Sequence, residues 1–307
     1  MADKRSDGLK GILPKGAVAV KLNKGQSFVF TEGPAWDGAG NLYFSDIPPQ
    51  LTYRMDSRGT FTVFRRNTNA GNGLCFNHAG NILMCEGGAH RVTEVDLKAQ
   101  VVRVVASEYG GKPLNAPNDI IVARDGGIYF SDPGFGTLNQ DVNAVYYVGQ
   151  DGVVVRVAQD AIMPNGVMLS PDERTLYIDD TYDRYVWAYD VRPDGRLGPG
   201  RKFCELKVTG KPSLADGEGK RVPVVGYPSA SIADGMAVDA LGNLYVTTQI
   251  GVQVFDKAGA YLGNIEAPEQ PSNVDFGGPD MRTLFITGWT SVYAVTLSVQ
   301  GVRFPQG

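Results

Sequence analysis

Short runs of apolar residues recur along the chain in one fixed arrangement. Each copy has a polar residue, a small residue, a short apolar run, a turn rich in Gly and Asp, and then a second run rich in β-branched and aromatic residues. The six copies begin at Glu32, Asn72, Asn118, Asn165, Asp234 and Asn273. Recurrence at a period of roughly 20–50 residues is typical of repeat architectures.

Each copy continues with a third run of the same kind, and a fourth often follows after another glycine turn. The third runs cover residues 51–55, 91–95, 145–148, 185–189, 252–255 and 291–295. Val, Ile, Tyr, Phe and Thr dominate these runs, and Gly, Asp, Asn and Pro bound them, as is typical of short strands. Six units of four antiparallel strands predict an all-β fold, a six-bladed β-propeller.

The repeat predicts one domain over residues 16–307, preceded by a polar, partly disordered lead-in at residues 1–15. The sixth copy ends after its third strand, near Leu297, so another segment must complete the last blade. Residues 17–22 have the pattern of a strand, and we expect them to pair there and close the ring, since closure removes exposed sheet edges. Residues 302–304 are the local alternative for that strand.

The composition narrows the class of protein. The chain is 43% hydrophobic and 20% charged, which is sufficient for a folded, soluble protein with a core. A net charge of -4 gives no reason to expect nucleic acid or an anionic membrane as a partner. No stretch approaches the ~20 apolar residues that span a bilayer, and residues 1–10 lack the apolar region of a signal peptide, which predicts a cytoplasmic protein.

Cysteine usage carries no sign of a zinc or redox site. Cys75 and Cys85 lie in neighbouring predicted strands and could be close, whereas Cys204 is distant from both in the sequence. The chain has no Cys-x-x-Cys motif. We therefore expect buried free thiols.

Alignment of the copies places their six polar starting residues at the same point of each blade, the start of the innermost strand. They should converge on the central axis. All six carry side-chain oxygen, with two carboxylates and four carboxamides, and such hard ligands suit Ca²⁺, with Mg²⁺, Mn²⁺ or Zn²⁺ as alternatives. Asn and Asp also begin strands for reasons of turn geometry. Their presence in six copies of six, with Glu32 in one, favours a metal site.

Acidic residues end four of the second strands and predict a wider collar at the same end of the propeller. These residues are Asp46, Glu86, Asp132 and Asp180. They could bind substrate hydroxyls or a second cation, although capping of turns is at least as good an interpretation for each. Asp132 ranks first because it opens the long loop at Pro133, and His90 lies in a loop at this end.

Known catalytic motifs of other classes are missing from the sequence. It has no Gly-x-Ser-x-Gly elbow and only two histidines, which disfavours a Ser-His-Asp hydrolase. It also has no P-loop or Gly-x-Gly-x-x-Gly motif. Metal-assisted chemistry remains, in which a cation polarises a carbonyl and a carboxylate takes a proton from water.

One long insertion, residues 209–232, accounts for the widest spacing between copies. It could cover the mouth of the central channel, and a surface insertion without such a role is an equally good interpretation.

The chain resembles the senescence marker protein/gluconolactonase/lactonase family of six-bladed propellers, which includes regucalcin-like proteins. The resemblance covers about residues 30–288. The motifs that carry it are 32–34 (EGP), 85–88 (CEGG) with 91–93 (RVT), 114–119 (LNAPND), 129–133 (YFSDP), 164–166 (PNG) and 234–236 (DGM). The family implies a divalent cation, usually calcium, and hydrolysis of sugar lactones or other lactones as small-molecule substrates.

The resemblance also implies roles for individual residues. Glu32, Asn165 and Asp234 match the family's metal ligands, and Asp234 matches its proposed general base. Asn118 matches a residue that contacts metal or substrate. Asp132, Glu86 and His90 are further candidates for substrate contact. Animal members carry Arg where this chain has Ala116, so their pattern of sugar contacts does not transfer.

Two other functions remain open from the sequence. A phosphotriesterase of the diisopropyl fluorophosphatase type has a similar ring of Glu, Asn, Asn and Asp. A propeller that binds a ligand or protein without catalysis, with calcium in a structural role, belongs to a different class. Two carboxylates at the channel end argue against a version without metal, since uncompensated buried charge is costly.

Overall fold

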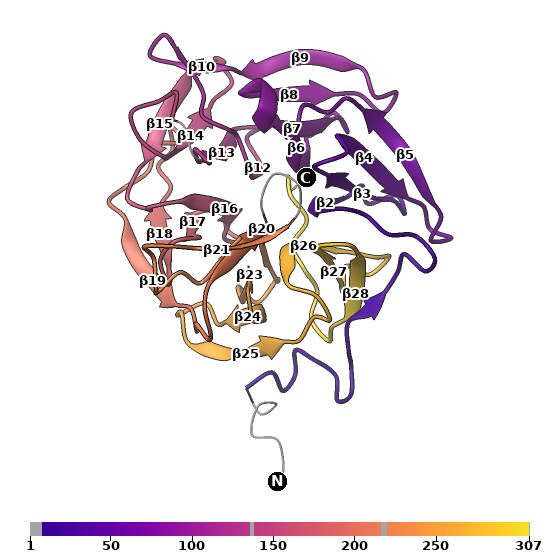
Figure 1. Ribbon diagram of the computed structural model, residues 1–307. Coiled ribbons are helices and arrows are strands. Elements are labelled where there is room, and N and C mark those ends of the chain that lie inside the picture. The colour runs from indigo at the N-terminus through magenta and orange to yellow at the C-terminus, as the bar shows by residue number, and fades with distance from the viewer. Residues whose placement is uncertain (1–7, 136–137, 216–219, 307) are drawn as a thin grey trace.

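The computed structural model describes residues 8–135, 138–215 and 220–306. Six four-stranded antiparallel sheets formed by these residues are arranged around a central axis (Figure 1), which confirms the predicted six-bladed propeller. The third runs of the sequence pattern match strands to within about one residue at each end. The innermost strand of every blade contains one of the six polar residues that start the copies, or begins two residues after it.

Each blade is given from the axis outwards. Blade 1 comprises β2 (Thr31–Trp36), β3 (Leu42–Asp46), β4 (Leu51–Met55) and β5 (Phe61–Arg66). Blade 2 comprises β6 (Gly71–Phe76), β7 (Ile82–Glu86), β8 (Arg91–Val95) and β9 (Val101–Ala106). Blade 3 comprises β12 (Ile120–Val122), β13 (Ile128–Asp132), β14 (Ala144–Val148) and β15 (Val154–Ala158).

Blade 4 comprises β16 (Pro164–Leu169), β17 (Thr175–Asp180), β18 (Tyr185–Asp190) and β19 (Arg201–Glu205). Blade 5 comprises β22 (Met236–Val238), β23 (Leu244–Thr248), β24 (Gly251–Phe255) and β25 (Tyr261–Ile265). Blade 6 comprises β26 (Pro271–Gly277), β27 (Thr283–Gly288), β28 (Val292–Thr296) and β1 (Val20–Lys21).

Two small hairpins and one helical turn lie outside the blades. The hairpins are β10 (Glu108–Tyr109) with β11 (Lys112–Pro113), and β20 (Ser213–Ala215) with β21 (Arg221–Pro223). The 3₁₀ turn η1 (Gly87–Ala89) is the one helical element in the part of the chain that the structure describes. None of the described residues therefore forms a helix that could cross a membrane.

An N-terminal strand completes the last blade. In β1, Val20 pairs with Ala294 and Lys21 pairs with Tyr293 of β28. Residues 302–304, the alternative for this position, run elsewhere: the backbone N–H of Val302 donates to the carbonyl of Val238, 3.0 Å away in blade 5. The C-terminal segment accordingly lies near the centre of the ring, whereas the N-terminal segment runs along its outside (Figure 1).

The expectation of a polar lead-in through residue 15 is wrong for its second half; residues 1–7 lie outside the described residues. Leu9 and Ile12 are 3% and 6% exposed and pack into the core shared by blades 5 and 6. Gly263 of β25 makes room for Leu9, because a Cβ on Gly263 would lie 2.6 Å from the Leu9 side chain. Leu9 and Ile12 lie three residues apart, so one turn of the chain buries both side chains. The segment nevertheless has a polar composition, because Lys and Gly residues surround these two positions.

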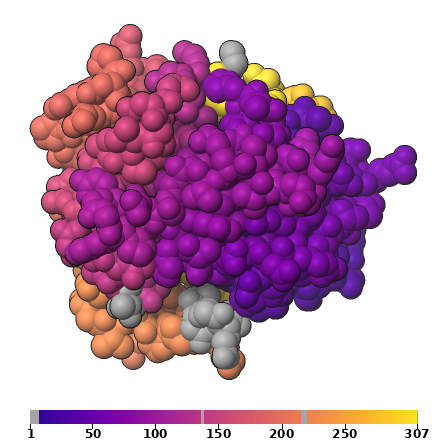
Figure 2. Space-filling model, turned by 90° about the horizontal axis from the view of Figure 1, so that it is seen from above, coloured from indigo at the N-terminus to yellow at the C-terminus, as the bar shows by residue number. Residues whose placement is uncertain are grey.

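Neighbouring blades pack face to face, which buries their inner strands on both sides. All six residues of β2 are buried, whereas four of the six residues of the outer strand β9 are exposed. Between blades 1 and 6, Trp36 stacks on Phe285 with ring centroids 5.5 Å apart. Viewed from the side, blades 1 to 3 form a wall without a gap (Figure 2). The three cysteines are free and buried, as expected.

Three of the four collar carboxylates hold the loops that lead into the innermost strands. Asp46 accepts the backbone N–H groups of Val29 and Phe30 at 3.0 and 2.9 Å. Asp132 accepts the N–H of Asn115 at 2.8 Å, and Asp180 accepts the N–H groups that precede Pro164. These carboxylates thereby fix the backbone just before the axial residues.

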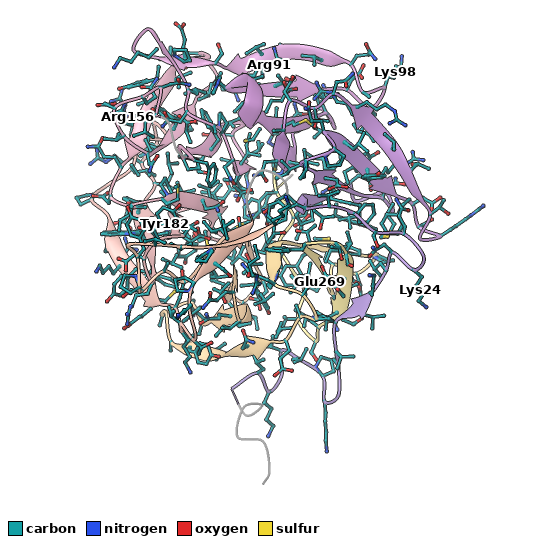
Figure 3. The ribbon with its side chains drawn as sticks, viewed as in Figure 1. Lys24, Arg91, Lys98, Arg156, Tyr182 and Glu269 are labelled. Carbon is teal, nitrogen blue, oxygen red and sulfur yellow. The ribbon has the colours of Figure 1, made fainter. Side chains whose placement is uncertain are left out.

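Glu86, the fourth member of the collar, is part of a buried ion-pair cluster. It lies 2.7 Å from Arg65 and 2.7 Å from Arg91, which Figure 3 labels on blade 2. Asn69 and Thr93 also donate to its carboxylate. Glu86 is fully buried, and hydrogen bonds from Asn69, Arg65 and Arg91 outweigh burial and lower its pKa. Its charge is therefore neutralised by one arginine of blade 1 and one of blade 2.

Substitution of the buried Leu9 tests whether the N-terminal segment stabilises the propeller. We expect Leu9→Ala to lower the free energy of unfolding by about 2–3 kcal/mol, because it removes buried methyl groups and leaves a cavity against blade 5. Lys10→Ala, at the exposed neighbouring position, is the control and should have little effect. Urea denaturation measures both; an unchanged midpoint for Leu9→Ala would show that this segment does not stabilise the fold.

Asp132→Asn tests the electrostatic effect of burying a collar carboxylate. Burial raises the pKa of Asp132 from 3.8 to about 7, so between these values the folded protein binds a proton that the unfolded chain has lost. The stability that this group contributes is present below its unfolded pKa and is lost as the pH rises through about 7. Because Asn does not ionise, the variant should gain stability relative to the parent between about pH 5 and pH 8, by roughly 1 kcal/mol or more.

Urea unfolding at both pH values measures this difference. Asp151→Asn, at an exposed turn position, is the matched control. A difference between Asp132→Asn and the parent that stays constant with pH would contradict the interpretation.

Candidate active site

The axial residues meet at the floor of a cavity of about 500 Å³. Five of the six residues that start the copies line it: Glu32, Asn72, Asn118, Asn165 and Asp234. The sixth, Asn273, lines a much smaller cavity of about 50 Å³ deeper in the channel, where Arg303 and Phe304 of the C-terminal segment also lie. The larger cavity has the size of a small-molecule site, and the smaller one holds at most a few waters.

Glycines after four of the axial residues allow this convergence. A Cβ on Gly33 would lie 2.4 Å from the carbonyl oxygen of Asn72, and one on Gly166 would lie 2.2 Å from that of Asp234. Real Cβ atoms do not approach backbone this closely. Each glycine therefore lets its innermost strand lie directly against an axial residue of the next blade.

In blades 3 and 6, where no glycine follows the axial residue, buried carboxylates connect neighbouring blades. Asp119 follows Asn118 and accepts the backbone N–H of Val167 in blade 4 at 3.0 Å. Asp275 in blade 6 accepts the N–H of Trp36 in blade 1 at 2.9 Å. Burial raises the pKa of Asp119 to about 6 and that of Asp275 to about 7.

Sequence reasoning did not select Asp119 or Asp275 as part of the channel. For Asp119 a signal existed, because an acidic residue stands there at a position where four copies have Gly. Asp179 was also missed, although it aligns with Ser45, Ser131 and Thr247 on the second strands. One of its oxygens accepts the N–H of Gly166 at 3.0 Å, and the other is buried without a partner.

Glu32 and Asp234 form a coupled pair of carboxyl groups on the axis. Their side chains share a hydrogen bond, and Glu32 also accepts the N–H of Gly33 at 2.8 Å. Burial is the main cause that raises the pKa of Glu32 to about 7. Burial, followed by the negative charges of Glu32, Asp179 and Asp119, raises the pKa of Asp234 well above 3.8. Without a counterion the pair therefore retains a proton near neutral pH.

Two carboxamide oxygens on the same ring are buried and have no hydrogen-bond partner. These are the Oδ1 atoms of Asn165 and Asn72. The Nδ2 group of Asn165 donates to the hydroxyl of Thr181 at 3.1 Å, and that hydroxyl donates to the carbonyl of Ala233 at 2.7 Å. These two hydrogen bonds fix the orientation of the Asn165 carboxamide. Its Nδ2 group faces Thr181, and its Oδ1 atom receives no hydrogen bond from the described part of the protein.

The donor set fits a hard divalent cation. The ring holds two carboxyl groups with raised pKa values and two carboxamide oxygens without a hydrogen-bond donor. None of these groups has a cationic partner among the described residues of the site, and Ca²⁺ and Mg²⁺ prefer oxygen ligands of this kind. No group of three or more His, Cys, Asp or Glu residues with metal-binding geometry occurs in the described part of the chain. The set here differs from such a group because carboxamides supply part of it. Glu32, Asn165 and Asp234 are the residues that would hold the ion.

Asn118 lies in the same cavity and its backbone is fixed on both sides. Its N–H donates to the carbonyl of Ser131 at 2.9 Å, and its own carbonyl accepts the N–H of Gly73 at 2.8 Å. The structure thus brings Asn118 together with Glu32, Asn165 and Asp234.

The other three predicted substrate contacts do not line this cavity. Glu86 is enclosed by arginines, and Asp132 is fully buried beneath the loop at Asn115. His90 is exposed, and its Nδ1 lies against the carbonyl of Asn115. The repeat alignment correctly indicates that these residues lie at the same end of the propeller as the axial residues. It does not indicate which side chains reach the cavity, because that depends on the loops between the strands.

The insertion at residues 209–232 reaches across part of the cavity mouth. At one end Tyr182, which Figure 3 labels on blade 4, stacks on Tyr227 with ring centroids 4.4 Å apart. At the other end the guanidinium of Arg221 lies 5.1 Å from the ring centroid of Trp289, in the turn between β27 and β28 of blade 6. Between these anchors Leu214 of β20 lines the cavity. Of the two interpretations of this insertion, a cover over the mouth is the one that the position of Leu214 supports; residues 216–219 lie outside the described residues.

Comparison with known proteins finds relatives that match most of the chain. A gluconolactonase from Zymomonas mobilis is 29% identical over 298 residues, covering 89% of this chain and 80% of its own. Pentonolactonase XacC from Haloferax volcanii is 27% identical over 83% of this chain and 80% of its own. The solved structure of a gluconolactonase from Xanthomonas campestris is 31% identical, with a TM-score of 0.80 and coverage of 95% of this chain and 92% of that one.

A sequence model of one family spans nearly all of the propeller. The region that it matches, residues 30–290, begins just before the first axial residue and ends after the innermost strands of all six blades. The chain belongs to the SMP-30/gluconolactonase/LRE-like family.

Proposed function

We propose that this protein is a divalent-cation-dependent lactonase that opens its substrate at the floor of the axial cavity. The observation that carries the proposal is the convergence of a coupled Glu32–Asp234 pair with the orphaned oxygen of Asn165 in a cavity large enough for a small lactone. The gluconolactonase and pentonolactonase relatives support hydrolysis of a lactone as the reaction. Calcium is the cation that the oxygen ligands favour.

Glu32, Asn165 and Asp234 would hold the cation. When bound, a divalent cation polarises a lactone carbonyl and stabilises the negative charge that develops on its oxygen. Asp234 takes a proton from the attacking water, a role for which its position on the cavity floor and its raised pKa suit it. Asn118 donates hydrogen bonds from its carboxamide and orients the lactone, since its backbone is held from both sides.

The neighbouring carboxyl groups position this machinery. Asp179 holds the N–H of Gly166 and so fixes the backbone beside Asn165. Asp132 holds the loop that enters blade 3 just before Asn118. These groups act on the backbone of the axial residues and do not contact the substrate.

Glu32→Gln tests the ligand set by binding alone. After treatment with a chelator, the parent should bind one Ca²⁺ in calorimetry, and Glu32→Gln should weaken binding at least ~10-fold, because the amide keeps the size of the side chain and removes its charge. Glu108→Gln removes the same charge at an exposed position in β10 and is the matched control. Equal affinity for Glu32→Gln and the parent would remove Glu32 from the ligand set.

Asp234→Asn separates proton transfer from metal binding. Asn retains one ligand oxygen, so the variant should still bind the cation while kcat for lactone hydrolysis falls by about 10²–10⁴-fold, the usual contribution of a general base. Asn118→Ala should mainly raise KM. Undiminished hydrolysis by metal-loaded Asp234→Asn would refute its role as base. If the parent hydrolyses no lactone but cleaves a fluorophosphate, the protein is a phosphotriesterase instead.

A further inference from the structure

The walls of the axial cavity differ in chemistry from its floor. The floor consists of the oxygen-bearing axial residues. The walls above it are apolar, and their main members are Phe30, Ile47, Pro117, Leu214, Pro271 and Trp289. Phe30 and Trp289 stand edge to face, with ring centroids 6.3 Å apart, and form one continuous aromatic side.

Polar side chains on the walls are few and already have partners. Among the described residues that line the cavity, only Gln270 and Ser272 are polar and lie outside the axial set. The hydroxyl of Ser272 donates to the carbonyl of Thr31 at 2.7 Å and contacts Thr287 at 2.9 Å. The carboxamide oxygen of Gln270 accepts from Arg221. The hydroxyl of Ser272 is therefore already engaged, and the Nε2 group of Gln270 alone cannot replace the water around several substrate hydroxyls.

No cationic side chain occurs among the described residues that line the cavity. Arg221 contacts two wall residues, Trp289 and Gln270, but does not itself line the cavity. Ala116 does line it, with no polar atom on its side chain. A phosphate, sulfonate or carboxylate on the substituent would therefore find no cationic side chain among the described residues of the walls.

On the basis of the proposed lactonase activity, we infer that the preferred substrate is a lactone with an alkyl or aryl substituent, rather than a polyhydroxylated sugar lactone. The ring lies over the axial residues, and the substituent lies against Phe30, Leu214 and Trp289. A buried hydroxyl without a hydrogen bond disfavours a sugar lactone. Each methylene transferred from water to the walls favours the alkyl lactone by about fourfold.

Three δ-lactones with the same six-membered ring test this preference. They are δ-valerolactone without a substituent, δ-decalactone with a pentyl chain, and D-glucono-δ-lactone with hydroxyl groups. For the calcium-loaded parent we expect kcat/KM for δ-decalactone to exceed that for δ-valerolactone by about 30-fold or more, since several methylenes become partly buried. The kcat/KM for D-glucono-δ-lactone should be lower than that for δ-decalactone.

Trp289→Ala should remove most of the gain from the pentyl chain. We expect kcat/KM for δ-decalactone to fall at least ~10-fold, while that for δ-valerolactone changes by no more than about threefold, because the ring contacts only the floor. Leu241→Ala, at a turn on the opposite end of the propeller, is the matched control; Leu241 is 64% exposed and should have no effect. Equal losses for both lactones would overturn the placement of the substituent.

A binding measurement makes failure of the inference distinguishable from failure of the proposed function. Calorimetry should show that the pentyl-substituted δ-lactam, which resists hydrolysis, binds at least ~10-fold more tightly than unsubstituted δ-valerolactam, and that Trp289→Ala narrows this gap. If no lactone is hydrolysed with any cation but this gap is present, the proposed function fails and the apolar preference stands. If gluconolactone is hydrolysed fastest and the pentyl group adds nothing to binding, the lactonase stands and the inference is wrong.

Discussion

The geometry of the central channel depends on how closely neighbouring innermost strands approach one another. At Gly33 and Gly166, no side chain fits between the strand and the axial residue of the next blade. Any larger residue would push the blades apart and move the axial side chains away from their common centre. Where a glycine is not present, the carboxylates of Asp119 and Asp275 bridge adjacent blades by accepting a backbone N–H group. Polar backbone contacts therefore determine the radius of the ring, and apolar packing between the faces of the blades maintains it.

This close approach concentrates negative charge. Burial raises the pKa values of Glu32, Asp119 and Asp234, and their mutual repulsion adds to the shift for Asp234. Such a cluster is stable only when it retains protons or binds a cation. The collar carboxylates avoid the same repulsion because they already have partners: arginines for Glu86 and backbone N–H groups for Asp132. The two acidic rings at one end of the propeller thus differ: the collar holds loop backbone, and the axial pair is the one to which the proposed function assigns the chemistry.

In the proposed function, chemistry and specificity arise from different parts of the chain. The repeated strands supply the polar floor, to which five of the six blades contribute a side chain at the same position. The walls come from segments that differ between blades, such as the loop at Ile47, the insertion that carries Leu214 and the turn at Trp289. Connecting loops can vary while the scaffold holds the reacting groups in place. Relatives that act on different lactones are consistent with this division of roles.

The sequence by itself determined the number of blades, the order of strands and the residues that meet on the axis. Strand alternation and turn chemistry are local properties, and superposing the copies places equivalent residues such as Glu32 and Asp234 at one point. The tertiary structure decided the rest. It showed that Leu9 is buried, that the carboxylate of Asp119 connects two blades, that Asp132 holds a loop, and that apolar side chains surround the floor. These outcomes depend on which distant segments come into contact, and no local pattern records that.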